Sequence, residues 1–372
     1  MQLSVRHLTG PDALTEIGAP FDALAAAESL PFTARRTWLQ AWVDTHSAWE
    51  PWVVLAEADG ELLAAAPLAR RRRAGLLQVV LLGHGPTDDA RLPARTPEAA
   101  AAVAQAVAAE LRRGGPWRMR FQQLPADDLV TAALVEALPA ADVRPGQAMP
   151  LVETVGSDPD AYLSKNSKKA LAKIRNRLRD RDLEPLLRWV TDADEVIALI
   201  PELMRVHRER DLALGRRPDH DDPASAAFYR EVISRHARSG EIDLLTLRLD
   251  GDLAAYVCAF RDGRTLRSWD NRLAPRWADL SAGRLANTEA LRHVVASEHY
   301  DALDWMRGEE SYKLQTATRV VPTADLQAWS SPSLRRVEAL ASSAVVRARA
   351  AVRGSAVHRG VQRVRRLRHG AG

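Results

Sequence analysis

One stretch of the sequence, residues 264–313, combines residue types that could bind an anion and act on it. A β-prone run ends in Trp-Asp-Asn at 269–271, and a periodic helix begins with the segment 280–284, which reads Leu-Ser-Ala-Gly-Arg. Small residues such as Ser281 and Gly283 at a helix start leave backbone N–H groups free to face an anion at the positive end of the helix dipole. The spacing therefore predicts a phosphate cradle at the start of this helix.

Three elements must position this cradle. The β-prone runs at 264–271 and 302–306 flank the helix, which the apolar spacing extends to about residue 297. A strand, a helix and a second strand form a βαβ unit, whose strands are parallel and are joined by a right-handed crossover. We therefore expect the cradle to lie between the ends of the two strands.

The same order of elements occurs in the first half of the chain. Hairpins with Asp-Gly turns at 59–60 and 250–251 are each followed by a strand, a helix and another strand. We interpret this order as a tandem duplication of one α/β unit with mixed sheets, the first unit at 1–150 and the second at 151–325. The first copy lacks the small-residue helix start, so we expect the ligand site in the second unit.

The composition is that of a soluble globular protein. The 372 residues suffice for two domains, 46% of them are hydrophobic and 27% are charged, and no apolar run is long enough to cross a membrane. The single cysteine, Cys258, excludes an internal disulfide framework and favours a reducing compartment. The N-terminus lacks the pattern of a signal peptide. These features predict a cytoplasmic protein with Cys258 in its core.

Positive charge is concentrated in two segments. Residues 165–181 contain eight Lys or Arg and one acid, and residues 334–372, an Arg-rich tail, contain ten Arg and one acid. The first segment has an apolar stripe at helical spacing and could clamp a polyanion, such as the coenzyme A phosphates, the head of a nucleotide-sugar lipid, or tRNA. The tail could lie on an anionic membrane surface or contact nucleic acid. Either segment could equally be solvated surface.

Taken in order, the motifs resemble those of GNAT N-acyltransferases. The narrower resemblance is to the tandem-GNAT group that includes CelD-like acetyltransferases and Fem-type peptidoglycan aminoacyltransferases. It covers residues 150–320 and, more loosely, 30–145. The chain departs from the usual phosphate signature, Arg/Gln-x-x-Gly-x-Gly/Ala, because it has one glycine in that loop. The matching segments are the basic helix after Ser164, the run 205–210 with Gly215 and a later Phe228-Tyr229, the second Asp-Gly hairpin, residues 280–285 and residues 303–313.

The resemblance implies a fold, a reaction and a donor. It implies two tandem GNAT-like units, the first degenerate, and transfer of an acyl group, with acetyl as the leading choice, from acyl-CoA to an amine by direct attack. Acyl-CoA (acetyl-CoA) would be the co-substrate, no metal would be needed, and the donor would lie where the two parallel strands diverge. The residues placed at the donor are Trp269 and Asn271, near the thioester oxyanion, and Ser281, Gly283 and Arg284, at the pyrophosphate.

Direct attack needs a proton acceptor for the ammonium and a proton donor for the leaving thiolate. Asp270, at a strand end beside the cradle, is the first candidate for the base or for orienting the amine, although it could simply cap a turn. Asp304 alternates with apolar residues in a strand, so it is either a site residue or the partner of an arginine. Tyr312 could protonate the thiolate and Lys313 could hold an anionic group, unless both lie in a surface loop.

Acceptor binding is the least constrained prediction. The resemblance places the helix of His207 and Glu209 beside the acceptor, although His-Arg-Glu-Arg is also typical of a solvated ion-pair face. The run 219–222, Asp-His-Asp-Asp, is expected to be a loop rather than a metal site.

Three functions remain open from the sequence. The first is acyl transfer from acyl-CoA to a small-molecule or glycan-linked amine. The second is a Fem-like transfer from aminoacyl-tRNA, against which the missing helical-hairpin insertion counts. The third is a non-catalytic GNAT-fold scaffold in polysaccharide or envelope biosynthesis that docks to a membrane complex through its Arg-rich tail.

Overall fold

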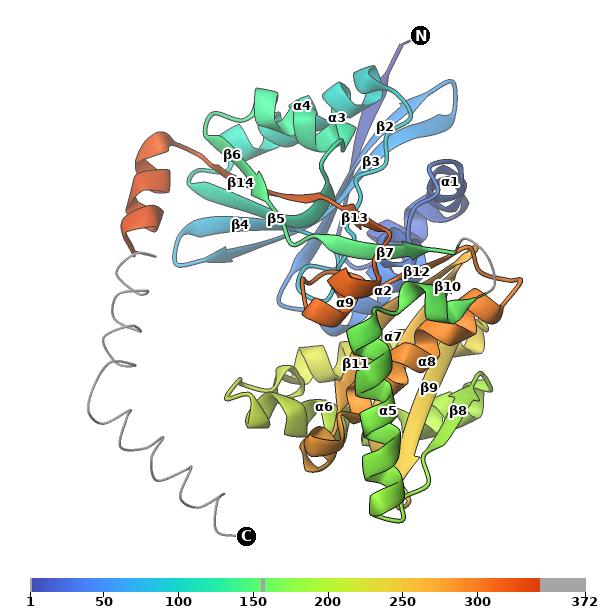
Figure 1. Ribbon diagram of the computed structural model, residues 1–372. Helices are drawn as coiled ribbons and strands as arrows, with labels where there is room; N and C mark the ends of the chain where they lie inside the picture. The colour runs from blue at the N-terminus through green and yellow to red at the C-terminus, as the bar shows by residue number, and fades with distance from the viewer. Residues whose placement is uncertain (1, 155–157, 342–372) are drawn as a thin grey trace, which may run out of the picture.

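The computed structural model describes residues 2–154 and 158–341, and these residues form two mixed α/β units, each built on a seven-stranded sheet (Figure 1). The expected fold class, with two tandem units, is confirmed. In neighbour order, the first sheet contains β1 (Ser4–Thr9), β2 (Glu50–Ala58), β3 (Glu61–Arg73), β4 (Leu76–Leu81), β5 (Trp117–Pro125), β14 (Thr323–Trp329) and β6 (Ala141–Pro145). The second contains β13 (Arg319–Val321), β7 (Met149–Glu153), β12 (Ala302–Asp304), β11 (Thr265–Leu273), β10 (Asp252–Asp262), β9 (Ile242–Leu249) and β8 (Leu186–Val190).

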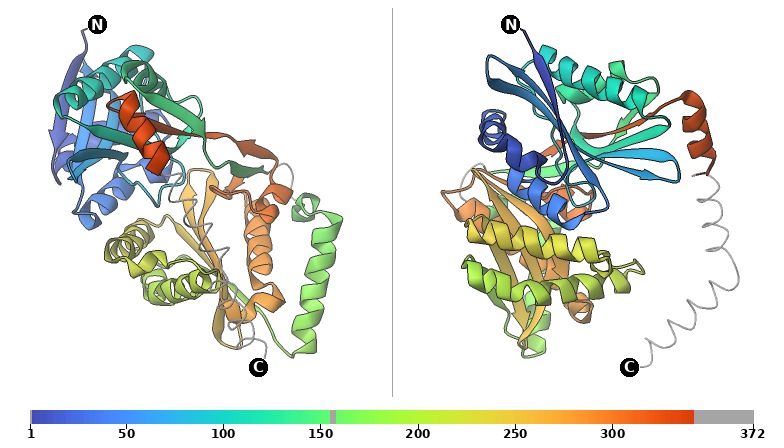
Figure 2. Two further views of the ribbon diagram at one scale, coloured as in Figure 1. Left: turned by 90° about the vertical axis from the view of Figure 1, so that its left-hand side faces the viewer. Right: turned by 180° about the vertical axis from the view of Figure 1, so that it is seen from behind.

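Helices cover both faces of the second sheet, with α6 and α7 on one face and α8 and then α5 on the other (Figure 2). None of the helices in the described part of the chain is long and apolar enough to span a membrane. The helices are α1 (Ala13–Ala27), α2 (Arg36–Thr45), α3 (Pro97–Arg113) and α4 (Leu129–Ala137) in the first unit, and α5 (Lys165–Asp180), α6 (Ala193–Ala213), α7 (Pro223–Arg238), α8 (Ala282–Ala296) and α9 (Ser311–Thr316) in the second.

The predicted repeat of elements is present in both units. The β2–β3 and β9–β10 hairpins turn at Asp59-Gly60 and Asp250-Gly251, where all four residues have positive φ, as this tight turn requires. The pairs β4–β5 and β11–β12 are both parallel, and α3 and α8 connect them.

The two units are joined by exchanged strands and by a shared core. Strand β14 lies near the end of the described chain, yet it pairs with β5 and β6 of the first sheet. The larger hydrophobic core runs from one face of the first sheet through α1 and α2 into the second unit. Helices α3 and α4 cover the other face of the first sheet and form a separate core. The chain therefore returns to the first unit at residues 323–329, where the sequence placed the end of the second.

The C-terminal segment is described only at its beginning. Residues 332–341 are helical, and Glu338 accepts hydrogen bonds from Arg120 and from Trp329 of β14. Most of the predicted Arg-rich tail lies outside the described residues.

A buried arginine connects the units at the base of the β11–β12 pair. The guanidinium of Arg267 in β11 lies 2.6 Å from both Asp262 and Asp304 and 3.3 Å from Asp89, which belongs to the first unit. Burial alone would lower the pKa of Arg267, but the three carboxylates outweigh it and raise that pKa. Because its partners come from both units, Arg267 fixes the loop after β4 against the second sheet.

Replacing Arg267 with methionine should therefore destabilise the protein strongly, because the buried Asp304 loses its counter-ion. Asp89 and Asp262 each lose one of two arginine partners among the described residues. We expect a loss of about 3–5 kcal/mol in the free energy of unfolding, measured by chemical denaturation. The matched control is Arg264→Met, which removes an exposed ion pair with Asp301 one residue before the same strand. Equal denaturation midpoints for the two variants would contradict this role of Arg267.

Candidate active site

The parallel pair β11–β12 opens into a fork. Pairing begins at Thr265 with Ala302 and stops at Arg267 with Asp304, whereas β11 continues to Leu273. Residues 268–273 therefore have no strand partner on that side among the described residues. This open edge includes Trp269 and Asn271, and a backbone N–H group that points outward from it has no strand partner in the described part of the chain.

Helix α8 begins beside the fork. Ser281 has left-handed backbone angles (φ 54°), and the N–H groups of Ala282 and Gly283 donate no hydrogen bond within the described structure. A Cβ atom on Gly283 would lie 3.0 Å from Leu273 Cδ2, so the glycine lets the helix start approach β11 closely. The exposed side chain of Arg284 follows. The predicted cradle at 281–284 therefore combines two backbone N–H groups, free within the described residues, at a helix start with an exposed arginine.

A β-bulge in β11 places Trp269 beside Asp270. Across the β10–β11 pair, Cys258 is opposite Asp270 and Ala259 is opposite Ser268, so Trp269 has no partner. A bulge re-aims the side chains around it, because the alternation of the strand is interrupted. The consecutive residues 269–272 all line one cavity.

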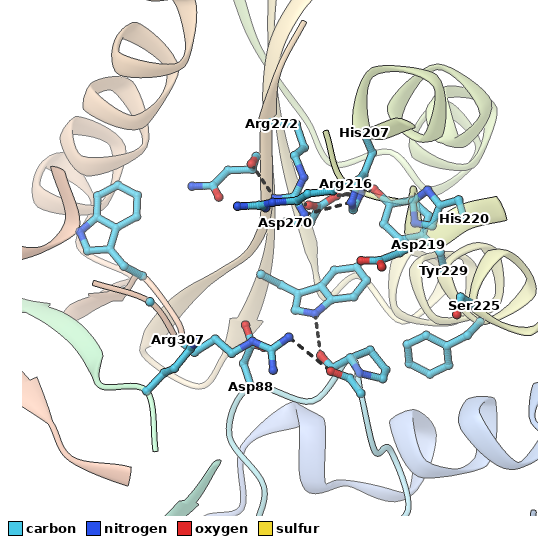
Figure 3. A pocket seen from close by; sticks show the side chains of 18 of the residues that line it. Asp88, His207, Arg216, Asp219, His220, Ser225, Tyr229, Asp270, Arg272 and Arg307 are labelled. Atoms are coloured by element: carbon cyan, nitrogen blue, oxygen red, sulfur yellow. Dashed lines mark hydrogen bonds and ion pairs between the residues drawn. The ribbon is translucent and has the colours of Figure 1, made fainter. Parts of the chain in front are cut away.

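This cavity has a volume of about 560 Å³ and lies between the two units, beside the fork (Figure 3). Its lining from the second unit includes His207, Arg216, Asp219, His220, Tyr229, residues 269–272, Trp305, Arg307 and Lys313. Its lining from the first unit is His46, His84, Gly85, Pro86, Asp88 and Gln147. A smaller cavity of about 30 Å³ between α5, α8 and α9 shares Trp305 with the large one.

Asp270 is buried and held by several partners at one side of the cavity. Its Oδ2 accepts hydrogen bonds from Tyr229 (2.8 Å) and Tyr256 (2.6 Å), and its Oδ1 lies 3.1 Å from Arg272. Burial alone would raise the pKa of Asp270, but Arg272, His207 and the Tyr256 hydroxyl outweigh it and hold that pKa well below its usual range. A carboxylate held in this way is a weak base, so the geometry favours the orienting role over the base.

His207 lies in the cavity wall, and Glu209 does not. His207 Nε2 is 3.0 Å from Arg272 Nη2, and its Nδ1 is 3.5 Å from Asp270. Residues two apart on a helix point in nearly opposite directions, and Glu209 accordingly accepts a hydrogen bond from Arg205 on the exposed side of α6. Among the described residues, His207, Asp211 and Asp219 are close enough together to ligate a metal ion. The positive guanidinium of Arg272 contacts the His207 ring nitrogen, which disfavours a metal cation there.

The remaining predicted residues separate into two groups. Asp304 does not line the cavity, because its carboxylate binds Arg267 and the backbone N–H of Met306, so it is the partner of an arginine.

Tyr312 lines the smaller cavity and accepts a hydrogen bond from Asn271 (3.0 Å). Burial raises the pKa of Tyr312 to about 12, so its hydroxyl keeps a proton to donate. Lys313 lines the large cavity, where its Nζ donates to the Arg307 carbonyl (2.6 Å).

The contribution of the first unit to the cavity was not predicted from the sequence. The loop after β4 brings His84 and Asp88 into the cavity, and its carbonyls at Pro86 and Gly85 accept hydrogen bonds from Trp269 and Arg307. The sequence did contain a signal for this contribution: the loop follows a strand of a parallel pair, and ligands bind at the carboxyl ends of parallel strands. His220, which was treated only as part of a loop, also lines the cavity, and burial lowers its pKa to about 4.

Replacing Asp270 with asparagine should lower stability at neutral pH by about 3 kcal/mol, because Arg272 would lose its buried counter-ion. A carboxyl group whose pKa is depressed by folding stabilises the protein above its unfolded pKa, near 3.9, and this contribution is lost as the pH falls through and below that value. The difference between variant and unaltered protein should therefore shrink below about pH 4 in chemical denaturation. The control Asp279→Asn changes an exposed carboxylate. A constant difference between pH 7 and pH 3 would contradict the depressed pKa.

Part of the chain matches a known protein family. Residues 165–314 match the family model of the acetyltransferase (GNAT) domain. A comparison with curated proteins found no match.

Solved structures resemble the chain over nearly its whole length. FemX has a TM-score of 0.58 at 9% identity, covering 90% of this chain and 100% of that one. L-PGS from Bacillus licheniformis has a TM-score of 0.52 at 14% identity, covering 87% and 95%. A tandem GNAT protein from the clavulanic acid biosynthesis pathway has a TM-score of 0.51 at 14% identity, covering 89% and 99%. Residues 165–314 are therefore similar to the acetyltransferase (GNAT) domain, which supports the expected GNAT-type acyltransferase, and the chain has the tandem GNAT fold.

Proposed function

We propose that this protein transfers an acyl group, acetyl in the simplest case, from acyl-CoA to a primary amine held in the 560 Å³ cavity. The observation that carries the proposal is the fork between β11 and β12, with the free N–H groups of α8 beside it and the cavity opening onto it. A thioester lying along β11 would present its carbonyl carbon to the cavity. The acceptor is a small-molecule or glycan-linked amine.

The donor phosphates would bind at the start of α8. The N–H groups of Ala282 and Gly283 are unused within the described structure, and Arg284 has no ion-pair partner there. Together they offer two backbone donors, a helix dipole and one full positive charge to a pyrophosphate. The thioester oxygen would accept hydrogen bonds from the unpaired edge of β11 near Trp269 and Asn271.

The reaction follows from these positions. The amine nitrogen forms a bond to the thioester carbon, the carbon–sulfur bond breaks, and the thiolate takes a proton from the Tyr312 hydroxyl, which is re-protonated from solvent. The ammonium form of the acceptor must lose one proton before the attack, and the nitrogen must release another to the solvent of the open cavity after it. Asp270 keeps His207 and Arg272 in place at the wall of the cavity.

The donor site can be tested without knowing the acceptor. Coenzyme A and acetyl-CoA should raise the melting temperature, and Arg284→Glu should weaken coenzyme A binding at least about 10-fold in calorimetric titration, because a charge-assisted contact to phosphate becomes repulsive. Arg284 is exposed, so its replacement should leave the melting temperature of the free protein unchanged.

The matched control is Arg238→Glu, which reverses an exposed arginine at the end of α7. The proposal fails if coenzyme A neither binds calorimetrically nor shifts melting of the unaltered protein. Equal affinities for Arg284→Glu and Arg238→Glu would remove Arg284 from the donor site.

One observation favours a second donor, aminoacyl-tRNA. Helix α5 has 16 residues and is therefore about 24 Å long. It packs beside α8 through Leu171, Ile174 and Leu178, while the rest of its surface is strongly basic. Its exposed cations without an ion pair or a side-chain hydrogen bond to any described residue are Lys165, Lys168, Lys169, Lys173 and Arg175. This row is longer than the phosphates of coenzyme A require and suits the repeating phosphates of a nucleic acid.

For the aminoacyl-tRNA alternative we expect binding of tRNA that weakens steeply with salt and falls at least about 10-fold in the triple variant Lys165→Glu, Lys169→Glu, Lys173→Glu. These residues are four apart and form one line along α5. The control reverses Arg112 and Arg113, two exposed residues at the end of α3. No tRNA binding by the unaltered protein in filter binding at low salt would exclude this donor.

A further inference from the structure

The first unit places one buried carboxylate in the cavity. Asp88 lies in the loop after β4, is 7% exposed, and faces Arg307 across the junction of the two units (Figure 3). Its Oδ1 forms an ion pair with Arg307 Nε at 2.7 Å. Its carboxylate accepts no hydrogen bond from the residues that the structure describes. The carboxylate is thus held in place by one cation and keeps acceptor capacity for a ligand in the cavity.

The other acidic residues of the cavity differ from Asp88 in this respect. Asp270 uses its two oxygens for two tyrosine hydroxyls and for Arg272. Asp219 and Glu310 are exposed, and Glu310 lies 3.2 Å from the Lys313 ammonium. Among the cavity carboxylates of the described chain, Asp88 therefore combines burial with an oxygen that is free to receive a proton.

The proton affinity of Asp88 suits this task. Burial raises the pKa of Asp88 to about 6, against the opposing effect of Arg307, Lys313 and Arg272 and with a contribution from Asp304. Three histidines of the cavity wall, His46, His84 and His220, have a pKa lowered by burial, that of His220 to about 4. A general base is most effective when its pKa lies near the working pH. Asp88 is a stronger base than His220 and is still ionised at pH 7.

We propose that Asp88 accepts the proton that the acceptor ammonium must lose before it attacks, so that the first unit supplies the base for chemistry in the second. This inference rests on the proposed acyl transfer. The proton moves from the ammonium nitrogen to Asp88 Oδ2 and from there to solvent through the open cavity. The nitrogen lone pair then forms the new bond to the thioester carbon, as described above.

The test compares Asp88→Asn with the unaltered protein, using thiol release from acetyl-CoA with glycine, lysine, glucosamine and ethanolamine as probe amines. Asparagine keeps the size of the side chain and an oxygen for Arg307, so the fold and the coenzyme A melting shift should be retained. We expect kcat to fall at least about 100-fold, the usual contribution of a general base. In the unaltered protein kcat/KM should fall below about pH 6, where Asp88 gains a proton, and this limb should disappear in the variant.

Hydroxylamine as the acceptor distinguishes a base from a purely structural role of Asp88, because a structural defect would lower thiol release with every acceptor alike. It is uncharged at neutral pH, so it needs no deprotonation before attack, and Asp88→Asn should lose far less activity with it than with the probe amines. The control Asp128→Asn replaces a first-unit carboxylate whose pKa is also raised by burial but which caps α4 outside the cavity. It should leave turnover unchanged.

The outcomes separate the two proposals. A coenzyme A shift and thiol release that survive in Asp88→Asn within about threefold would overturn the role of Asp88 and leave the acyl transfer standing. An equal loss with hydroxylamine and with the probe amines would also overturn it. If the unaltered protein shows neither a coenzyme A shift nor thiol release with any probe amine, the proposed function fails and the role of Asp88 fails with it.

Discussion

The arrangement of the molecule depends on one buried guanidinium. Arg267 lies at the base of the fork, and its partners come from three separate segments: the loop after β4, the end of β10 and the end of β12. A buried arginine needs a carboxylate partner to compensate its charge, and Arg267 has three in the described structure. Asp262 also accepts a hydrogen bond from the backbone N–H of Phe32, which ties a second segment of the first unit to the same network. The two units are therefore held in one relative position at the place where the β11–β12 pair opens.

This constraint explains how a site can be divided between the units. The second unit contributes the fork, the bulge at Trp269 and the start of α8, which in our proposal bind and orient an acyl donor. The first unit has no small-residue helix start, yet its loop after β4 forms part of the cavity wall, because Asp89 binds Arg267 and the neighbouring Asp88 pairs with Arg307. The unit that the sequence describes as degenerate is thus a required part of the acceptor cavity in the reaction that we propose.

Most of the fold could be predicted from local patterns, whereas part of the site could not. The Asp-Gly turns, the parallel strand pairs and the helix start at Ser281 each follow from short-range periodicity and turn chemistry. The bulge at Trp269 depends on the register with β10, and the position of β14 depends on the chain crossing back between units, so neither has a local signal. The position of Asp88 in the cavity could not be predicted, because it depends on how the two units dock and on the ion pair with Arg307. The exclusion of Glu209 from the cavity, by contrast, could have been predicted, because its spacing of two residues from His207 places it on the opposite side of α6.

Hydrogen–deuterium exchange in the presence and absence of coenzyme A tests the central claim most directly, because it reports on both units at once. The account predicts slower exchange at the start of α8 (281–284) and along the unpaired edge of β11 (268–273), together with slower exchange in the loop after β4 (83–89) when acetyl-CoA and an amine are both present. Unchanged exchange in α8 and β11 under saturating coenzyme A, or protection confined to segments outside the fork and the cavity, would contradict an acyl-donor site in this fork.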